Sequence, residues 1–112
     1  MIINIEEKSG VTVFIISGRI DAGSADGLKK KFKENNQPGN NYVFDLAGVD
    51  FIDSTGLGSI VSALKSAVES DGNVKIAALQ AKPRMVFEIT RAYKIFDIFD
   101  DVDSAVESYS QD

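Results

Sequence analysis

The sequence predicts an α/β domain built on a mixed, mainly parallel β-sheet. Short β-branched and aromatic segments alternate with segments whose apolar residues recur at helical spacing, an order typical of sheets covered by helices. The 112 residues suffice for one domain and are too few for two ordinary ones. With 44% hydrophobic and 26% charged residues, the composition is that of a globular protein. We therefore expect four or five strands and about four helices in a single domain spanning residues 1–112.

The chain opens with a predicted β-hairpin. Apolar segments at 3–5 and 11–16 flank Lys8-Ser9-Gly10, which is typical of a turn. The second segment is apolar on both faces, as expected of a strand that is covered on both sides, and we expect it to end at Gly18. A helix should begin after Ser24, a favoured N-cap residue, and run to an asparagine-rich turn.

The middle of the chain predicts a strand, a long helix and a further strand. The first strand covers 42–46 and is bounded by Gly48, and the second covers 74–78. The helix between them should run to about residue 70, where Asp71-Gly72-Asn73 stops it. Its apolar residues form one stripe at helical spacing, made of Leu57, Ile60, Val61, Leu64 and Val68.

Three short elements are expected in the C-terminal part. Lys82-Pro83 should open a helix with proline at its first position, and its core-facing residues should be Met85, Val86 and Ile89. Residues 93–99 predict a short edge strand. Ser104 and Glu107 have the spacing of a capping box, which predicts a terminal helix that starts after Ser104.

The composition excludes several classes of function. The chain has no Cys and no His, which rules out disulfides, zinc fingers, thiol catalysis and an imidazole base. Its net charge of -5 argues against general affinity for nucleic acid or for an anionic membrane. No apolar run is long enough for a signal peptide or a membrane span. We expect a cytoplasmic protein without a cofactor, a monomer or at most a weak dimer.

The segment Asp50-Phe-Ile-Asp-Ser-Thr-Gly-Leu-Gly58 lies between a predicted strand and the clearest helix. The first turn of a helix carries unpaired N–H groups and the positive end of the dipole, so it favours an anion. One interpretation is that Asp53, Ser54 or Thr55 simply caps the helix. One cap, however, needs one side chain, and a glycine in the first turns costs up to about 1 kcal/mol relative to Ala. A surface for close approach of a partner would explain so many small residues.

The motif Asp53-Ser-Thr-Gly-Leu-Gly58 resembles the signature of STAS domains of the anti-sigma factor antagonist type. Gly18-Arg-Ile-Asp21 resembles the Gly-acidic-aliphatic-Asp element at the end of the second strand in that bacterial family. Pro83-Arg-Met-Val-Phe87 resembles the start of its third helix, so the likeness covers essentially the whole chain. Arg19 departs from the family, which usually has an acidic residue there, and this leaves the identity of the partner open.

The resemblance implies a STAS-like fold and a switch between partners. The unphosphorylated family members bind an anti-sigma factor that is also a serine kinase, and so free the sigma factor. The kinase phosphorylates the serine that corresponds to Ser54, which ends binding, and a serine phosphatase resets the antagonist. The implied partner-binding residues are Asp21, Asp53, Ser54, Thr55, Gly56, Leu57 and Gly58. Two of these also have a plain structural interpretation, because Leu57 has core spacing and Asp21 suits a turn after a strand.

Two other functions stay open at this point. A STAS-type domain can be a scaffolding or transport-complex subunit without a phosphorylation switch, although such domains often lack a hydroxyl at the position of Ser54. Ser62-Ala-Leu-Lys65 matches the S-x-x-K spacing of serine acyltransferases, so a small hydrolase using Ser54 or Ser62 is a third hypothesis. The missing His and the missing companion motifs argue against it, and we expect no enzyme.

Two charged clusters have simpler interpretations. The lysines at 29–31 and Lys33 lie opposite an apolar helix face, which is typical of a solvated surface and less often of a docking site for an acidic partner. The aspartates between 97 and 103 lack the glycine and the terminal glutamate of a calcium loop. An acidic surface with a helix N-cap is the favoured interpretation.

Overall fold

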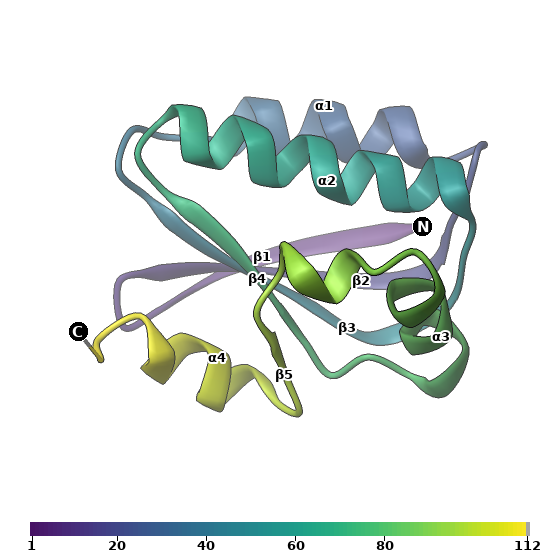
Figure 1. The fold of residues 1–112 in the computed structure, drawn as a ribbon. Helices are drawn as coiled ribbons and strands as arrows, with labels where there is room; N and C mark the ends of the chain where they lie inside the picture. Colours follow the sequence, from purple (N-terminus) through teal and green to yellow (C-terminus); the bar gives the residue numbers. More distant parts are fainter. Residues whose placement is uncertain (112) are drawn as a thin grey trace.

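The structure is a computed structural model that describes residues 1–111, and its centre is a five-stranded sheet with the strands in chain order (Figure 1). The strand β1 runs antiparallel to β2, and the other neighbouring strands are parallel. The mixed, mainly parallel sheet is therefore confirmed. The elements are β1 (Ile2–Lys8), β2 (Val11–Ile20), α1 (Ala25–Asn35), β3 (Asn41–Ile52), α2 (Ser54–Glu69), β4 (Asn73–Ala77), α3 (Ala81–Ile89), a 3-10 turn (Ala92–Lys94), β5 (Ile98–Phe99) and α4 (Val102–Ser108).

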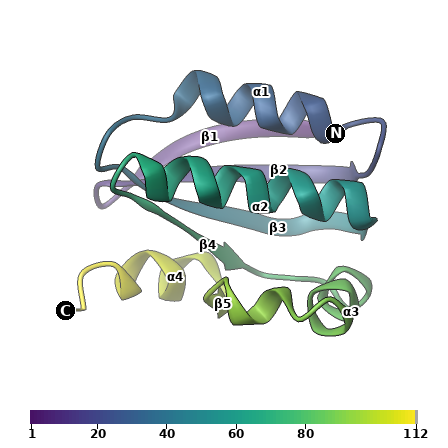
Figure 2. The same ribbon diagram turned by 45° about the horizontal axis from the view of Figure 1, so that its top comes forward.

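The helices cover the two faces of the sheet unequally. The helices α1 and α2 lie side by side on one face, and α4 lies on the other (Figures 1 and 2). The helix α3 packs beside the end of β3. Within residues 1–111, no helix combines the length and the apolar character needed to cross a bilayer.

An aromatic cluster joins α1 to β2 and β3. The ring of Phe32 on α1 lies 4.8 Å from that of Tyr42 and 5.6 Å from that of Phe14, measured between ring centroids. All three side chains are buried. The Tyr42 hydroxyl accepts a hydrogen bond from the N–H of Gln37 at 2.8 Å, so its polar end also holds the asparagine-rich turn. Rings of this size contribute most of the apolar area that a small core buries.

The buried stripe of α2 differs from the predicted one at its C-terminal end. Leu57 and Ile60 are buried, as their spacing predicts, whereas Val68 is 56% exposed. Ala63 and Ala67 face the core in its place. Their small side chains allow α2 to pack closely on the sheet. The predicted stripe was based on larger apolar residues and therefore left these alanines out.

Two predicted strand ends were wrong, because both strands continue past the glycines that should have ended them. The strand β2 runs beyond Gly18 to Ile20, and β3 runs beyond Gly48 to Ile52. The pairing between them shifts register twice in this region, as β-bulges do. A Cβ on Gly48 would lie 2.8 Å from the Cβ of Ser17, so this glycine permits a close approach of two strands.

The predicted core face of α3 was largely wrong. Pro83 and Phe87 are buried, while Met85 is 55% and Ile89 77% exposed. Val86 is partly buried against the core. The helix begins at Ala81, which places Pro83 in the third position instead of the first. Proline is tolerated there because an N–H in the first turn has no partner within the helix.

The last two predicted elements are also shifted. The helix α4 begins at Val102, and its cap is Asp101, whose carboxylate accepts a hydrogen bond from the N–H of Ser104 at 2.7 Å. The predicted capping box at Ser104 was therefore wrong by three residues. The edge strand is reduced to Ile98–Phe99, because the 3-10 turn Ala92–Lys94 and an irregular segment at 95–97 come before it.

Candidate functional site

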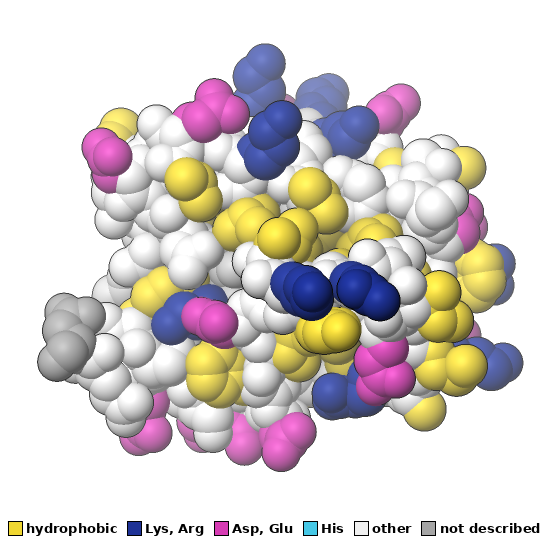
Figure 3. All heavy atoms as spheres, in the orientation of Figure 1, with side chains coloured by type: hydrophobic (Ala, Val, Ile, Leu, Met, Phe, Trp, Pro, Cys, Tyr) yellow, Lys and Arg dark blue, Asp and Glu magenta, His cyan; other side chains and the backbone are white. Residues whose placement is uncertain are grey.

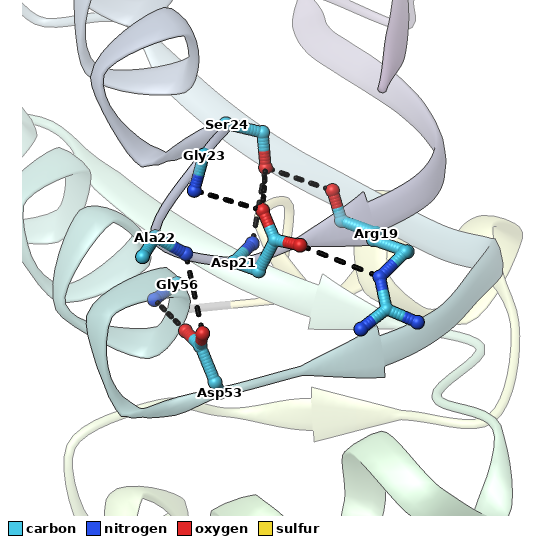
Figure 4. Close-up of polar contacts among 7 residues, drawn as sticks. All are labelled: Arg19, Asp21, Ala22, Gly23, Ser24, Asp53 and Gly56. Atoms are coloured by element: carbon cyan, nitrogen blue, oxygen red, sulfur yellow. Dashed lines mark hydrogen bonds and ion pairs between the residues drawn. The ribbon is translucent and has the colours of Figure 1, made fainter.

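The candidate site lies where the parallel strands β2 and β3 end side by side. Ile20 pairs with Ile52 at this edge, and the next residues lead directly into α1 and α2. The N–H of Asp53 donates to the carbonyl oxygen of Ile20 at 3.3 Å, which extends the ladder by one bond. Ligand sites in open α/β sheets are typically found at the carboxyl ends of such strands. The predicted neighbourhood of Asp21 and Asp53 is therefore present (Figure 4).

Asp53 is the residue that caps α2. One carboxylate oxygen, Oδ1, accepts a hydrogen bond from the N–H of Gly56 at 2.7 Å. The other, Oδ2, accepts from the N–H of Ala22 at 3.2 Å, in the loop that follows β2 (Figure 4). One side chain thus positions both the start of the helix and the neighbouring loop.

Ser54 and Thr55 are left with free hydroxyl groups. They are the first two residues of α2, and both are exposed. Within residues 1–111, neither hydroxyl makes a hydrogen bond, because Asp53 already supplies the cap. The sequence offered three candidates for that cap, and the structure assigns it to one. An exposed hydroxyl at a helix N-terminus lies where the dipole favours added negative charge.

Asp21 is held in a turn by its neighbours. Its carboxylate accepts hydrogen bonds from the N–H of Gly23 at 3.0 Å and from Nε of Arg19 at 3.3 Å (Figure 4). The Ser24 hydroxyl donates to the Arg19 carbonyl oxygen at 2.8 Å, so Ser24 ties the turn instead of capping α1 through its side chain. Desolvation raises the pKa of Asp21, but the Arg19, Gly23 and Ser24 hydrogen bonds and the Arg19 charge outweigh it and hold that pKa below its usual range.

Arg19 also packs on the aromatic ring of Phe51, which lies on the neighbouring strand. Its guanidinium carbon lies 4.0 Å from the ring centroid of Phe51, the residue opposite it on β3. The Arg19 side chain is 59% exposed. In the sequence, this contact could be suspected only from the aromatic residue two positions before Asp53. The position of Phe51 in a strand does not by itself show that Arg19 lies opposite it.

The glycines of the motif have two different environments. A Cβ on Gly56 would lie 1.8 Å from the carbonyl oxygen of Ile20, so this glycine is required for packing inside the domain. A Cβ on Gly58 would meet nothing within 4 Å, and Gly58 is exposed. Leu57 is 8% exposed and belongs to the core. The exposed part of the motif consists of Ser54, Thr55 and Gly58.

The remaining candidate residues lie apart from this site. Ser62 and Lys65 lie in the middle of α2, and within the described chain no hydrogen bond joins their side chains. The lysines of α1 are exposed and form the dark blue group at the top of Figure 3. Over residues 1–111, no group of three or more acidic side chains is arranged to hold a metal ion.

Comparison with known proteins identifies the family. The model of the STAS domain family matches residues 3–105. The anti-sigma-B factor antagonist of Bacillus subtilis (strain 168) is 34% identical over 83 residues, which cover 74% of this chain and 76% of that protein.

Solved structures share the fold over nearly the whole chain. An anti-sigma factor antagonist from Mycobacterium paratuberculosis has a TM-score of 0.85 at 25% identity, covering 96% of this chain and 92% of that one. A sulfate transporter family protein from Wolinella succinogenes has a TM-score of 0.77 at 19% identity, covering 90% and 85%. This second likeness concerns the fold alone. The chain belongs to the STAS domain family, in its group of anti-sigma factor antagonists.

Proposed function

We propose that the unphosphorylated chain binds an anti-sigma factor that is also a serine kinase, and thereby releases a sigma factor. Phosphorylation of Ser54 ends this binding, and a serine phosphatase restores it. The observation that carries the proposal is the free, exposed Ser54 hydroxyl on a helix whose cap is supplied by another residue. The proposed contact surface extends from Asp21 to the exposed residues of the motif, with Gly56 and Leu57 supporting it from inside.

Phosphorylation requires little from this chain beyond an accessible hydroxyl. The Ser54 oxygen attacks the γ-phosphorus of ATP, the new O–P bond forms as the bond to the β-phosphate oxygen breaks, and ADP leaves. The hydroxyl proton passes to a base of the kinase. The chain has no His to activate Ser54 as a nucleophile of its own, which suits a substrate residue better than a catalytic one.

The added charge explains how binding is lost without unfolding. A phosphoserine carries about -1.5 to -2 charges at neutral pH. At the first position of α2 this charge faces the positive end of the helix dipole, so the fold tolerates it. The carboxylate of Asp53 lies beside this position, and that of Asp21 is paired with Arg19. An acidic partner surface, or the phosphates of a nucleotide bound to the kinase, is then repelled, and like charges at an interface cost several kcal/mol.

The alternative is a scaffolding or transport-complex subunit without a switch. The likeness to a sulfate transporter family protein shows that the fold serves more than one purpose. The fold therefore does not choose between the two functions. The exposed hydroxyl of Ser54 favours the switch, because a kinase can reach it and because STAS-type scaffolding subunits often lack a hydroxyl at this position.

The test uses purified anti-sigma factors encoded in the same genome as this chain, titrated by calorimetry. The Ser54→Asp variant should keep the thermal unfolding transition and lose binding, whereas Ser54→Ala should bind but accept no phosphate from the kinase and ATP. Ser104→Asp is a matched control, because Ser104 is also exposed in the first turn of an aspartate-capped helix, α4.

Two results contradict the proposal. The first is undiminished binding by Ser54→Asp. The second is phosphopeptide mapping that places the phosphate on Thr55 or finds none after incubation with a kinase that binds the chain.

A further inference from the structure

Arg19 is a preformed donor of hydrogen bonds at the edge of the candidate site. Its guanidinium carbon lies over the Phe51 ring, 4.0 Å from the ring centroid, and Nε contacts Asp21 at 3.3 Å. In the described part of the chain, no acceptor contacts its two Nη atoms, which lie on the side away from Asp21 (Figure 4). These two contacts restrict the side chain while its outer donors stay free.

Such an arrangement is suited to a carboxylate. A guanidinium presents two parallel N–H donors that match the two oxygens of a carboxylate, a geometry that a lysine cannot reproduce. Because stacking and the Asp21 contact already restrict the side chain, binding costs less conformational entropy than it does for a mobile arginine.

An apolar groove begins at the same aromatic ring. It has a volume of about 390 Å³ and runs between the end of β3 and the outer face of α3. Its lining residues are Phe51, Ile52, Lys82, Met85, Val86 and Ile89. Met85 is 55% and Ile89 77% exposed, and hydrophobic side chains gather over α3 at the right of Figure 3. The exposed face of α3 therefore presents apolar side chains to solvent.

The groove is continuous with the proposed partner surface. Phe51 and Ile52 directly precede Asp53 and Ser54 in the chain, and Arg19 is two residues before Asp21. Arginine, methionine and aromatic residues are enriched in protein interfaces, and arginine and aromatic residues dominate their binding energy. Lys82 lines the groove and Arg19 lies over the Phe51 ring at its edge, and both are basic, although the chain as a whole carries -5.

We propose that this groove is a second contact area for the anti-sigma factor and that it selects a segment in which a carboxylate flanks an apolar side chain. The apolar side chain lies between Met85 and Ile89, and the carboxylate pairs with the two Nη groups of Arg19. This inference rests on the proposed function, because it assigns the groove to the same partner. It makes Arg19 a residue that determines partner specificity.

The test compares variants of the groove with matched controls in the calorimetric titration described above. Arg19→Ala should weaken binding about 30-fold, and Arg19→Lys should recover little of this loss, because a lysine lacks the paired donors. Ile89→Ser should weaken binding about 10-fold. The controls are Lys30→Ala on α1, which removes the same charge, and Val68→Ser at the far end of α2, which removes another exposed apolar side chain.

A charge exchange separates direct contact from an effect through Asp21. Arg19→Glu should bind more weakly than Arg19→Ala, and one Asp→Lys or Glu→Lys variant of the anti-sigma factor should restore its affinity at least about 10-fold. A variant that merely disturbs the Asp21 turn would not be rescued by a change in the partner.

The outcomes are distinguishable. If the unaltered chain binds no anti-sigma factor, the proposed function fails and this inference fails with it. If the unaltered chain binds but Arg19→Ala and Ile89→Ser bind equally well, the inference is overturned while the proposed function stands. If the two variants abolish self-association in analytical ultracentrifugation and leave binding to the anti-sigma factor unchanged, the groove takes a second copy of the chain, which also overturns the inference.

Discussion

The carboxylate of Asp53 accepts a hydrogen bond from the N–H of Ala22 at 3.2 Å, across the ends of two neighbouring strands. Its other oxygen caps α2 through the N–H of Gly56. The two contacts couple the helix that presents Ser54 to the loop that carries Asp21. A surface assembled in this way before the partner arrives loses less entropy on binding than a mobile one.

Replacing Asp53 should therefore loosen both elements at once. Asp53→Ala removes the cap and the bond to Ala22, and should lower the free energy of unfolding by about 1 to 2 kcal/mol in urea denaturation. Asp53→Asn keeps an acceptor for the cap and should lose less. Amide hydrogen exchange should become faster at Ala22 and Gly56 in the alanine variant. Unchanged protection of both amides would show that Asp53 does not hold them.

The two glycines of the motif should respond in opposite directions. Gly56→Ala places a Cβ 1.8 Å from the Ile20 carbonyl oxygen, so the strand end or the helix must move. We expect a loss of about 2 to 3 kcal/mol. Gly58→Ala meets no atom within 4 Å and should raise the free energy of unfolding by up to about 1 kcal/mol, because alanine favours a helix. Equal effects of the two substitutions on stability would contradict these contacts.

Acid should remove the contribution of Asp21 to stability. Its pKa is held below the ordinary value of 3.8 despite the opposing effect of desolvation. A carboxyl with a lowered pKa in the folded state stabilises the fold above the unfolded value, and this contribution is lost as the pH falls through the folded value. An NMR titration should give a midpoint below 3.8 for Asp21 and a higher one in Arg19→Ala. An unshifted midpoint in that variant would show that Arg19 does not stabilise the carboxylate.

The terminal helix should affect stability without affecting the site. The Tyr109 hydroxyl donates to the carbonyl oxygen of Tyr42 at 2.7 Å, which ties the end of α4 to the sheet. Tyr109→Phe should lower the free energy of unfolding by about 1 kcal/mol. Tyr42 lies near the start of β3, about 30 Å along the strand from the candidate site, so affinity for the anti-sigma factor should not change. If Tyr109→Phe stayed folded and yet bound the anti-sigma factor more weakly, α4 would belong to the partner surface.

The order of strands and helices was largely predictable, because each element has its own local pattern of apolar residues. Even so, the faces of α3 were misjudged. Pro83 and Phe87 have the same four-residue spacing as Met85 and Ile89, and a periodic pattern cannot say which of two rows meets the sheet. Only the packing of α3 beside β3 decides that Phe87 is inside and Ile89 outside.

The motif at the start of α2 was recognisable for the same local reason. Aspartate, serine and threonine side chains all suit a helix N-terminus, so the sequence by itself determined where the helix starts and which residues compete there. It did not determine which of them is free. The assignment of the cap to Asp53 goes together with its second bond to Ala22, whose place beside it follows from the parallel pairing of β2 and β3.

For Gly56 and Arg19, too, the sequence shows the residue type but not the contacts that the residue makes. Their residue types were visible in the chain, but the need for a glycine comes from the Ile20 carbonyl oxygen, and the fixed position of Arg19 comes from the ring of Phe51 on the neighbouring strand. The sequence by itself determined the elements and the set of candidate side chains, since these depend on neighbours along the chain. Only the tertiary structure decided which of those side chains hold the site together and which remain free to meet a partner, because that depends on contacts between segments far apart in the sequence.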